Sequence, residues 1–235
     1  MNTVINQHLF RHRESKSAAF NNLCTLIHKL PEEGIYAGEV VQGKRLLGSF
    51  RLTCDAKNDS SQVNIDLSSF DALFRANLPQ LRHATDFAVG KDGYVVLHAS
   101  GHHDGLYVRL TKLAKEKQSP AFDSRRLKKG DLVAFRLWQP GAYTITNEPG
   151  GQKATLSVRE TDSGKYPDLT KLEPVRVTLS DKGFKPAKVE KWPAQALVVS
   201  LETSGSLTLH STKEPPVKAG ASKGEPPTAK KAKRT

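Results

Sequence analysis

Residues 94–112 read YVVLHASGHHDGLYVRLTK, and this stretch decides the class of fold. Six apolar residues alternate along its two ends: Val95, Leu97, Ala99, Leu106, Val108 and Leu110. Side chains two residues apart lie on one face of a β-strand, so we expect these six to face a core. The GHHDG turn between the two runs predicts a β-hairpin. Its outer face is expected to carry Tyr94, His98, Tyr107 and Arg109.

Short alternating runs recur on both sides of this hairpin. They include IYAGEVV, LLGSFRLTC and QVNIDLSSF before it, and LVAFRLW, ATLSVR, VRVTLS, ALVVSLE and SLTLH after it. Turn residues separate the runs at intervals of roughly 8 to 12 residues, which is typical of β-sandwiches. We therefore predict a mainly β fold with one or two antiparallel β-sandwiches.

Two segments depart from this alternation. The first precedes Pro31 and has five apolar residues at helical spacing: Phe20, Leu23, Cys24, Ile27 and Leu30. The second spans residues 67–81 and has four: Phe70, Leu73, Phe74 and Leu78. This spacing predicts a short amphipathic helix near the N-terminus and a second helix between the β-runs.

Composition divides the chain of 235 residues into four parts. We expect a basic arm and amphipathic helix at 1–34, a β-rich domain at 35–120, a second set of β-strands at 121–212, and a tail at 213–235. The tail is rich in Lys and Pro and lacks the apolar periodicity that would offset the entropy lost on ordering, so we expect it to be disordered.

Basic residues dominate the charge of the chain, which is +12 at neutral pH. Four of them crowd the segment before LVAFRLW, and four more end the tail: Arg125, Arg126, Lys128, Lys129, Lys230, Lys231, Lys233 and Arg234. Such clusters attract polyanions, because binding releases the counterions of the polymer. The competing interpretation is that these charges serve solubility alone.

The sequence also indicates where the protein acts. No run approaches the roughly 18 to 20 apolar residues that cross a bilayer, and the first residues lack the apolar stretch of a secretory signal. Cys24 and Cys54 form no CxxC pair and cannot be a disulfide framework for a chain of this length. We expect a soluble cytoplasmic protein with no membrane insertion.

Two later stretches resemble the cupredoxins, the copper-binding β-sandwiches. LKKGDLVAFRLWQPGAYTITNEPGGQKATLSVRE, at 127–160, is similar to the closing strands of that family. Residues 175–211, with the step Gly183-Phe184-Lys185-Pro186 and a strand ending near His210, are similar to its opening strands. The resemblance covers about residues 122–211. It implies a cupredoxin-like β-sandwich, built from tandem modules or from one rearranged module.

The copper ligands of that family are not matched. In cupredoxins the loop after the Tyr strand carries a Cys, a His and often a Met. Here Asn147 stands near the position of the Cys, and neither His nor Met follows within ITNEPGGQKATL. Because copper in this family needs a thiolate and two imidazoles, we expect no cofactor.

Histidines support an alternative that includes a metal. His98, His102, His103 and Asp104 lie within seven residues of the predicted hairpin, and His210 stands near the family's ligand position. Imidazoles and carboxylates are suitable ligands for zinc or copper. The alternative hypothesis is therefore a metal-handling cupredoxin relative that binds copper or zinc through these residues.

The chain carries no P-loop, dinucleotide-binding or HExxH motif. Its GxSxG match at 220–224 falls in the tail, where no strand-to-helix turn can present the serine. We therefore expect a non-enzymatic β-sandwich scaffold or accessory protein that binds a protein partner or further copies of itself. The basic tail is expected to add affinity for nucleic acid or another polyanion. A hydrolase-like enzyme is the second alternative.

Overall fold

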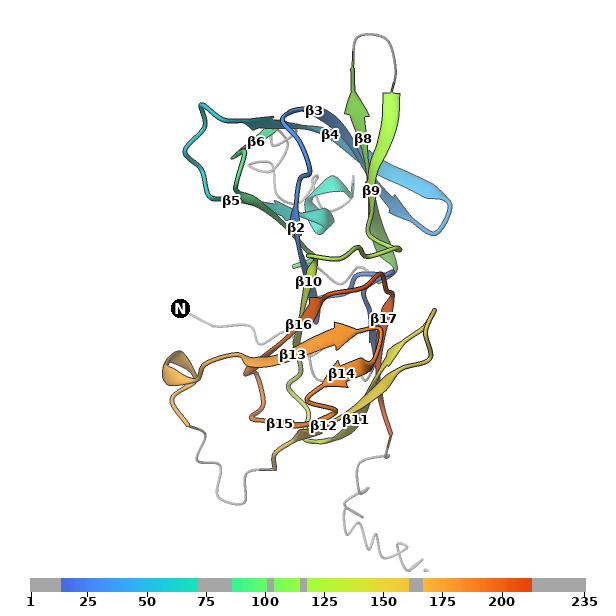
Figure 1. The fold of residues 1–235 in the computed structure, drawn as a ribbon, viewed down its shortest axis with the longest axis vertical. Helices are drawn as coiled ribbons and strands as arrows, with labels where there is room; N and C mark the ends of the chain where they lie inside the picture. The colour runs from blue at the N-terminus through green and yellow to red at the C-terminus, as the bar shows by residue number, and fades with distance from the viewer. Residues whose placement is uncertain (1–13, 72–85, 101–103, 115–117, 161–166, 213–235) are drawn as a thin grey trace, which may run out of the picture.

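The computed structural model describes residues 14–71, 86–100, 104–114, 118–160 and 167–212 (Figure 1). Within these ranges the protein is mainly β, as predicted, with seventeen strands in three sheets. The described helical segments are two short 3-10 turns, η2 (Leu67–Phe70) and η4 (Leu169–Lys171). None of the described helices has the length and apolar character needed to cross a bilayer.

A seven-stranded sheet runs through the whole structure. In spatial order it contains β14 (Gly183–Lys185), β13 (Val175–Ser180), β16 (Ala196–Leu201), β10 (Leu132–Arg136), β2 (Cys24–Lys29), β7 (Tyr94–His98) and β5 (Gln62–Asp66). Its central seam is the antiparallel pairing of β10 with β2, in which Val133 faces Leu26 and Phe135 faces Cys24. This ladder joins strands from the two halves of the chain.

A five-stranded sheet accompanies each end of the long sheet (Figure 1). The one toward the top of Figure 1 contains β6 (Asp86–Gly90), β4 (Arg45–Asp55), β3 (Gly34–Gln42), β8 (Leu106–Leu113) and β9 (Gln118–Asp123). The lower one contains β1 (Glu14–Lys16), β17 (Leu207–Ser211), β11 (Gly141–Asn147), β12 (Lys153–Val158) and β15 (Lys188–Lys191). Buried side chains of all three sheets form one hydrophobic cluster.

For residues 94–112 the structure confirms the predicted buried face but not the predicted pairing of the two strands. All six residues expected to face inward are buried: Val95, Leu97, Ala99, Leu106, Val108 and Leu110. The two strands do not pair with each other, however, because β7 pairs with β2 and β5, and β8 pairs with β3 and β9. Alternation determines which face of a strand is buried but does not select its partner. The hairpin prediction is therefore wrong, although both strands exist.

The predicted N-terminal amphipathic helix is also wrong. Residues 24–29 form β2, in which Cys24, Leu26 and His28 are buried and alternate with more exposed neighbours. The helical spacing of the larger apolar residues competes here with an equally good alternation of period two. The strand prevails because β10 and β7 pair with both of its edges and so satisfy its backbone hydrogen bonds.

The second predicted helix begins as the single 3-10 turn η2. The side chain of Asp66 caps that turn by accepting a hydrogen bond from the Ser68 backbone nitrogen at 3.0 Å. The rest of the predicted helix, together with most of the basic arm and the whole tail, lies outside the described residues.

Candidate functional site

The basic connector, residues 124–131, joins β9 to β10. Its first arginine, Arg125, forms a fork with Asp123: Nε lies 2.9 Å from Oδ1 and Nη2 lies 2.6 Å from Oδ2. Burial raises the pKa of the Asp123 carboxyl, but hydrogen bonds from Arg125 outweigh that effect, so the net pKa is lowered. The fork keeps the plane of the guanidinium group in one orientation.

Arg125 also stacks on an aromatic ring. Its Cζ atom lies 4.4 Å from the centroid of the Tyr107 ring, which comes from β8. The Tyr107 hydroxyl donates a hydrogen bond of 3.4 Å to the backbone oxygen of Gly43, at the tip of the hairpin between β3 and β4. Tyr107 therefore connects the basic connector to a hairpin tip that is distant in sequence.

The tip of this hairpin presents a second pair of basic residues, Lys44 and Arg45. Gly43 makes the turn with a φ of +59°, a conformation that glycine adopts without strain. The Gln42 side chain donates a hydrogen bond of 2.9 Å to the Asp104 backbone oxygen, which fixes the tip against the start of β8. Lys44 and Arg45 are exposed, and the hairpin projects from the side of the upper half in Figure 1.

We define the Tyr107 surface as Lys44, Arg45, Tyr107, Arg125 and Arg126. Asp123 balances the charge of Arg125. The exposed side chains of Lys44, Arg45 and Arg126, in contrast, form no ion pair with any described residue.

The surroundings of the Tyr107 surface leave it positively charged. Next to it, Arg109 pairs with Glu39 at 2.8 Å, so this pair adds no net charge. Asp104 adds one exposed carboxylate beside the hairpin. The three cations without ion pairs outnumber that carboxylate, and an anionic polymer would therefore be attracted to this surface.

A buried pair of residues holds the connector in place. His28 Nδ1 and Asp131 Oδ1 lie 2.6 Å apart, and the two residues are 5% and 2% exposed. The other carboxylate oxygen of Asp131 accepts a hydrogen bond of 2.7 Å from the Lys128 backbone nitrogen. The His28 ring stacks on Phe122 at the end of β9, with ring centroids 4.0 Å apart. His28 thus contacts Asp131, at the end of the connector, and Phe122, in the strand that precedes it.

This pair is buried too deeply to act on a dissolved substrate. The second nitrogen of His28, Nε2, is buried and has no hydrogen-bond partner among the described residues. Burial also raises the pKa of the Cys24 thiol to about 12 and raises that of Cys54, so neither thiol is activated as a nucleophile. The pair is best understood as an anchor between β2 and the connector.

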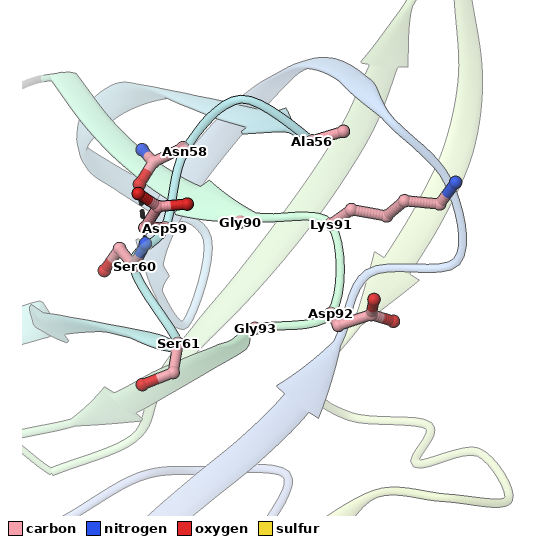
Figure 2. Close-up of a pocket in the computed structure, with 9 residues that line it drawn as sticks. All are labelled: Ala56, Asn58, Asp59, Ser60, Ser61, Gly90, Lys91, Asp92 and Gly93. Carbon is pink, nitrogen blue, oxygen red and sulfur yellow. Dashed lines mark hydrogen bonds between the residues drawn. The ribbon is translucent and has the colours of Figure 1, made fainter.

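A small polar cleft lies between the loop that joins β4 to β5 and the turn that joins β6 to β7 (Figure 2). Residues 56–61 face the turn 90–93, and the Gly90 backbone nitrogen donates a hydrogen bond of 2.8 Å to the Ser60 oxygen. The side chains of Lys91 and Asp92 point away from Asp59 in Figure 2. Because these charged groups do not converge, the cleft offers no centre at which a ligand would be held.

The residues predicted to bind metal are not brought together where they are described. His98 ends β7 in the seven-stranded sheet, whereas His210 is exposed on β17 of the lower sheet. Asp104 is exposed, and His102 and His103 lie outside the described residues. Among the described residues no three His, Cys, Asp or Glu side chains form a group suitable for a metal ion. The metal hypothesis stays a prediction.

Asn147, which stands near the family's cysteine position, has a structural role. Its Oδ1 accepts a hydrogen bond of 3.1 Å from the Ser206 backbone nitrogen, and its Nδ2 donates one of 2.8 Å to Gln152. The side chain is buried and ties the turn between β11 and β12 to the strand beside it. Both of its polar atoms are therefore used within the fold.

Of the residues predicted to bind polyanions, the structure describes the four in the connector. Arg126 and Lys129 are exposed, and Lys128 Nζ donates a hydrogen bond of 2.9 Å to the Ala121 oxygen. Lys230, Lys231, Lys233 and Arg234 lie outside the described residues. Sequence reasoning missed Lys44 and Arg45, whose only signal was a basic pair next to a hairpin glycine.

Compared with known proteins, the chain matches no family model, no curated protein and no solved structure. The resemblance to cupredoxins stays a prediction, and the function has to be argued from the molecular surface itself.

Proposed function

We propose that this protein is a non-enzymatic β-scaffold that binds an acidic macromolecule through the Tyr107 surface. The observation that carries the proposal is the convergence of two segments distant in sequence. Tyr107 contacts Gly43, which precedes Lys44 and Arg45 in the β3–β4 hairpin, and it contacts Arg125, which precedes Arg126 in the connector. These three exposed cations form no ion pair with a described carboxylate. The tail, residues 213–235, adds further basic charge to the same chain.

Electrostatics supports a polymer as the partner. A polyanion carries a layer of condensed counterions, and each Lys or Arg that replaces a counterion gains the entropy of its release. The net charge of +12 favours approach of such a polymer from a distance, while the fixed hairpin and connector offer a defined place to bind it. A protein partner with an acidic surface would be attracted by the same charges.

The arrangement of the sheets supports a role as a scaffold. The seven-stranded sheet connects both halves, and the buried His28–Asp131 pair fastens the connector to β2. Residues 122–211 supply β10 to β17, whose inward side chains share one core with the strands of the first half. The burial of the described histidine–carboxylate pair and of both thiols favours binding over catalysis.

Neutralising the Tyr107 surface should weaken polyanion binding. We expect the triple variant Lys44→Ala, Arg45→Ala, Arg126→Ala to lose about 10-fold or more in affinity for inorganic polyphosphate at low salt, because three charges that displace counterions are removed. Fluorescence anisotropy with end-labelled polyphosphate measures this change on the full chain.

The matched control removes three exposed lysines of the lower half: Lys153, Lys185 and Lys188. Net charge falls equally in both triple variants. A defined surface predicts that the control keeps its affinity to within about threefold, as expected for charges remote from the contact. Equal losses in the two variants would mean that only overall charge matters, and the proposed site would be wrong.

A further inference from the structure

Resting on the polyanion-binding role proposed above, we infer that the partner of the Tyr107 surface is a single-stranded nucleic acid, one base of which stacks on Arg125. The inference depends on how the Arg125 guanidinium group is held. Its inner face lies against the Tyr107 ring at 4.4 Å, and its Nε–Nη2 edge is occupied by both carboxylate oxygens of Asp123. The Arg125 side chain is nevertheless 46% exposed.

This arrangement favours stacking over phosphate binding. A free guanidinium binds phosphate through paired N–H donors, but in Arg125 the Nε–Nη2 edge serves Asp123, which also balances the charge. The flat outer face remains available, together with the N–H groups that Asp123 does not use. Nucleobases stack on guanidinium planes and on aromatic rings, and a platform that is already ordered loses little entropy when a base arrives.

The neighbouring cations can bind the phosphates of a single-stranded nucleic acid. Lys44 and Arg45 follow Gly43, which accepts the hydrogen bond of Tyr107, and Arg126 follows Arg125 in the connector. Each is exposed and without an ion pair to any described residue, so each is available to a phosphate. A basic surface that tracks the backbone beside a stacking platform is the usual design of proteins that bind single strands.

A duplex fits this platform less well. Its bases are paired and stacked on each other, so their faces are closed to a protein side chain unless the helix is opened. A polyanion without bases would use the cations but would gain nothing from Arg125. The three kinds of ligand therefore make different predictions.

The test compares four probes on the full chain at one salt concentration: a 12-nucleotide oligothymidylate, an abasic strand of the same length, a 12-base-pair duplex and polyphosphate. We expect the oligothymidylate to bind at least about 10-fold more tightly than the abasic strand, since stacking of one base contributes an effect of this size. Arg125→Lys keeps the charge but removes the plane, and should abolish most of that preference without changing affinity for the abasic strand.

Arg159→Lys is the matched control, because Arg159 lies over the Trp192 ring and pairs with Glu190 outside the Tyr107 surface. It should leave the affinities for both strands unchanged. Equal binding of the oligothymidylate and the abasic strand by the unaltered protein would overturn the inference while leaving the polyanion-binding role intact. Tighter binding of the duplex than of the oligothymidylate would overturn it as well. Failure to bind any of the four probes would instead contradict the proposed function.

Discussion

Replacing Asp131 with alanine is expected to lower the free energy of unfolding by about 2 to 4 kcal/mol, because each buried donor left without an acceptor costs about 1 to 3 kcal/mol. The carboxylate is almost fully buried and serves two donors, His28 Nδ1 and the Lys128 backbone nitrogen. The variant leaves both without a partner in a site where water cannot easily replace the carboxylate. The largest single effect of any polar substitution in the connector should therefore occur here.

Denaturant unfolding at neutral pH measures this loss. Asp59→Ala is the matched control, because Asp59 is an exposed carboxylate in the loop between β4 and β5. An exposed substitution of this kind should change stability by less than about 0.5 kcal/mol. A loss below about 1 kcal/mol for Asp131→Ala would show that the His28–Asp131 contact does not anchor the connector.

The titration of Lys191 should raise the free energy of unfolding as the solution becomes alkaline. Its side chain is 1% exposed, and Nζ donates hydrogen bonds of 3.2 and 2.7 Å to the backbone oxygens of Leu137 and Trp192. Burial, with a smaller contribution from Arg136, lowers the pKa of Lys191 from 10.5 to about 8. The charged amine is therefore less stable in the folded protein than in the unfolded chain.

The direction of the effect follows from proton binding. Below pH 8 both states carry the proton, and folding bears the full cost of burying the charge. Between pH 8 and 10.5 the unfolded chain binds the proton more strongly, so the free energy of unfolding rises with pH, by about 3 kcal/mol in total. Above pH 10.5 the contribution is constant.

Lys191→Met should remove this rise. The measurement is the difference in unfolding free energy between the unaltered protein and the variant from pH 7 to about 10.5, in which the titrations of Cys24, Cys54 and Tyr36 cancel. The exposed Lys188→Met, on the same strand, should give a curve parallel to that of the unaltered protein. A parallel curve for Lys191→Met would contradict the lowered pKa.

Buried faces were predictable from sequence, but strand partners were not. The alternation at 94–112 correctly predicts that Val95 and Val108 are buried, because side-chain direction depends only on the local period of two. Pairing, in contrast, depends on every other strand that competes for the same edge. The choice of β3 as a partner of β8 is set by an eight-residue ladder that begins at Ile35.

In the candidate site, too, local properties were predictable from the sequence, whereas contacts between distant segments were not. The sequence places Tyr107 on the outer face of its strand and marks Arg125 and Arg126 as basic, and both properties hold in the structure. That the ring of Tyr107 lies between the connector and Gly43 depends on the three-dimensional path of the chain. Likewise His28 and Asp131, separated by 103 positions, carry no local signal of their contact.

The salt dependence of single-strand binding tests the central claim most directly. For single strands the logarithm of the binding constant falls against the logarithm of salt concentration with a slope of about −0.7 for each phosphate neutralised. If Lys44, Arg45 and Arg126 each meet one phosphate, the triple alanine variant of the full chain should show a slope smaller in magnitude by about 2. Identical slopes for the variant and the unaltered protein would mean that these three side chains do not touch the polymer.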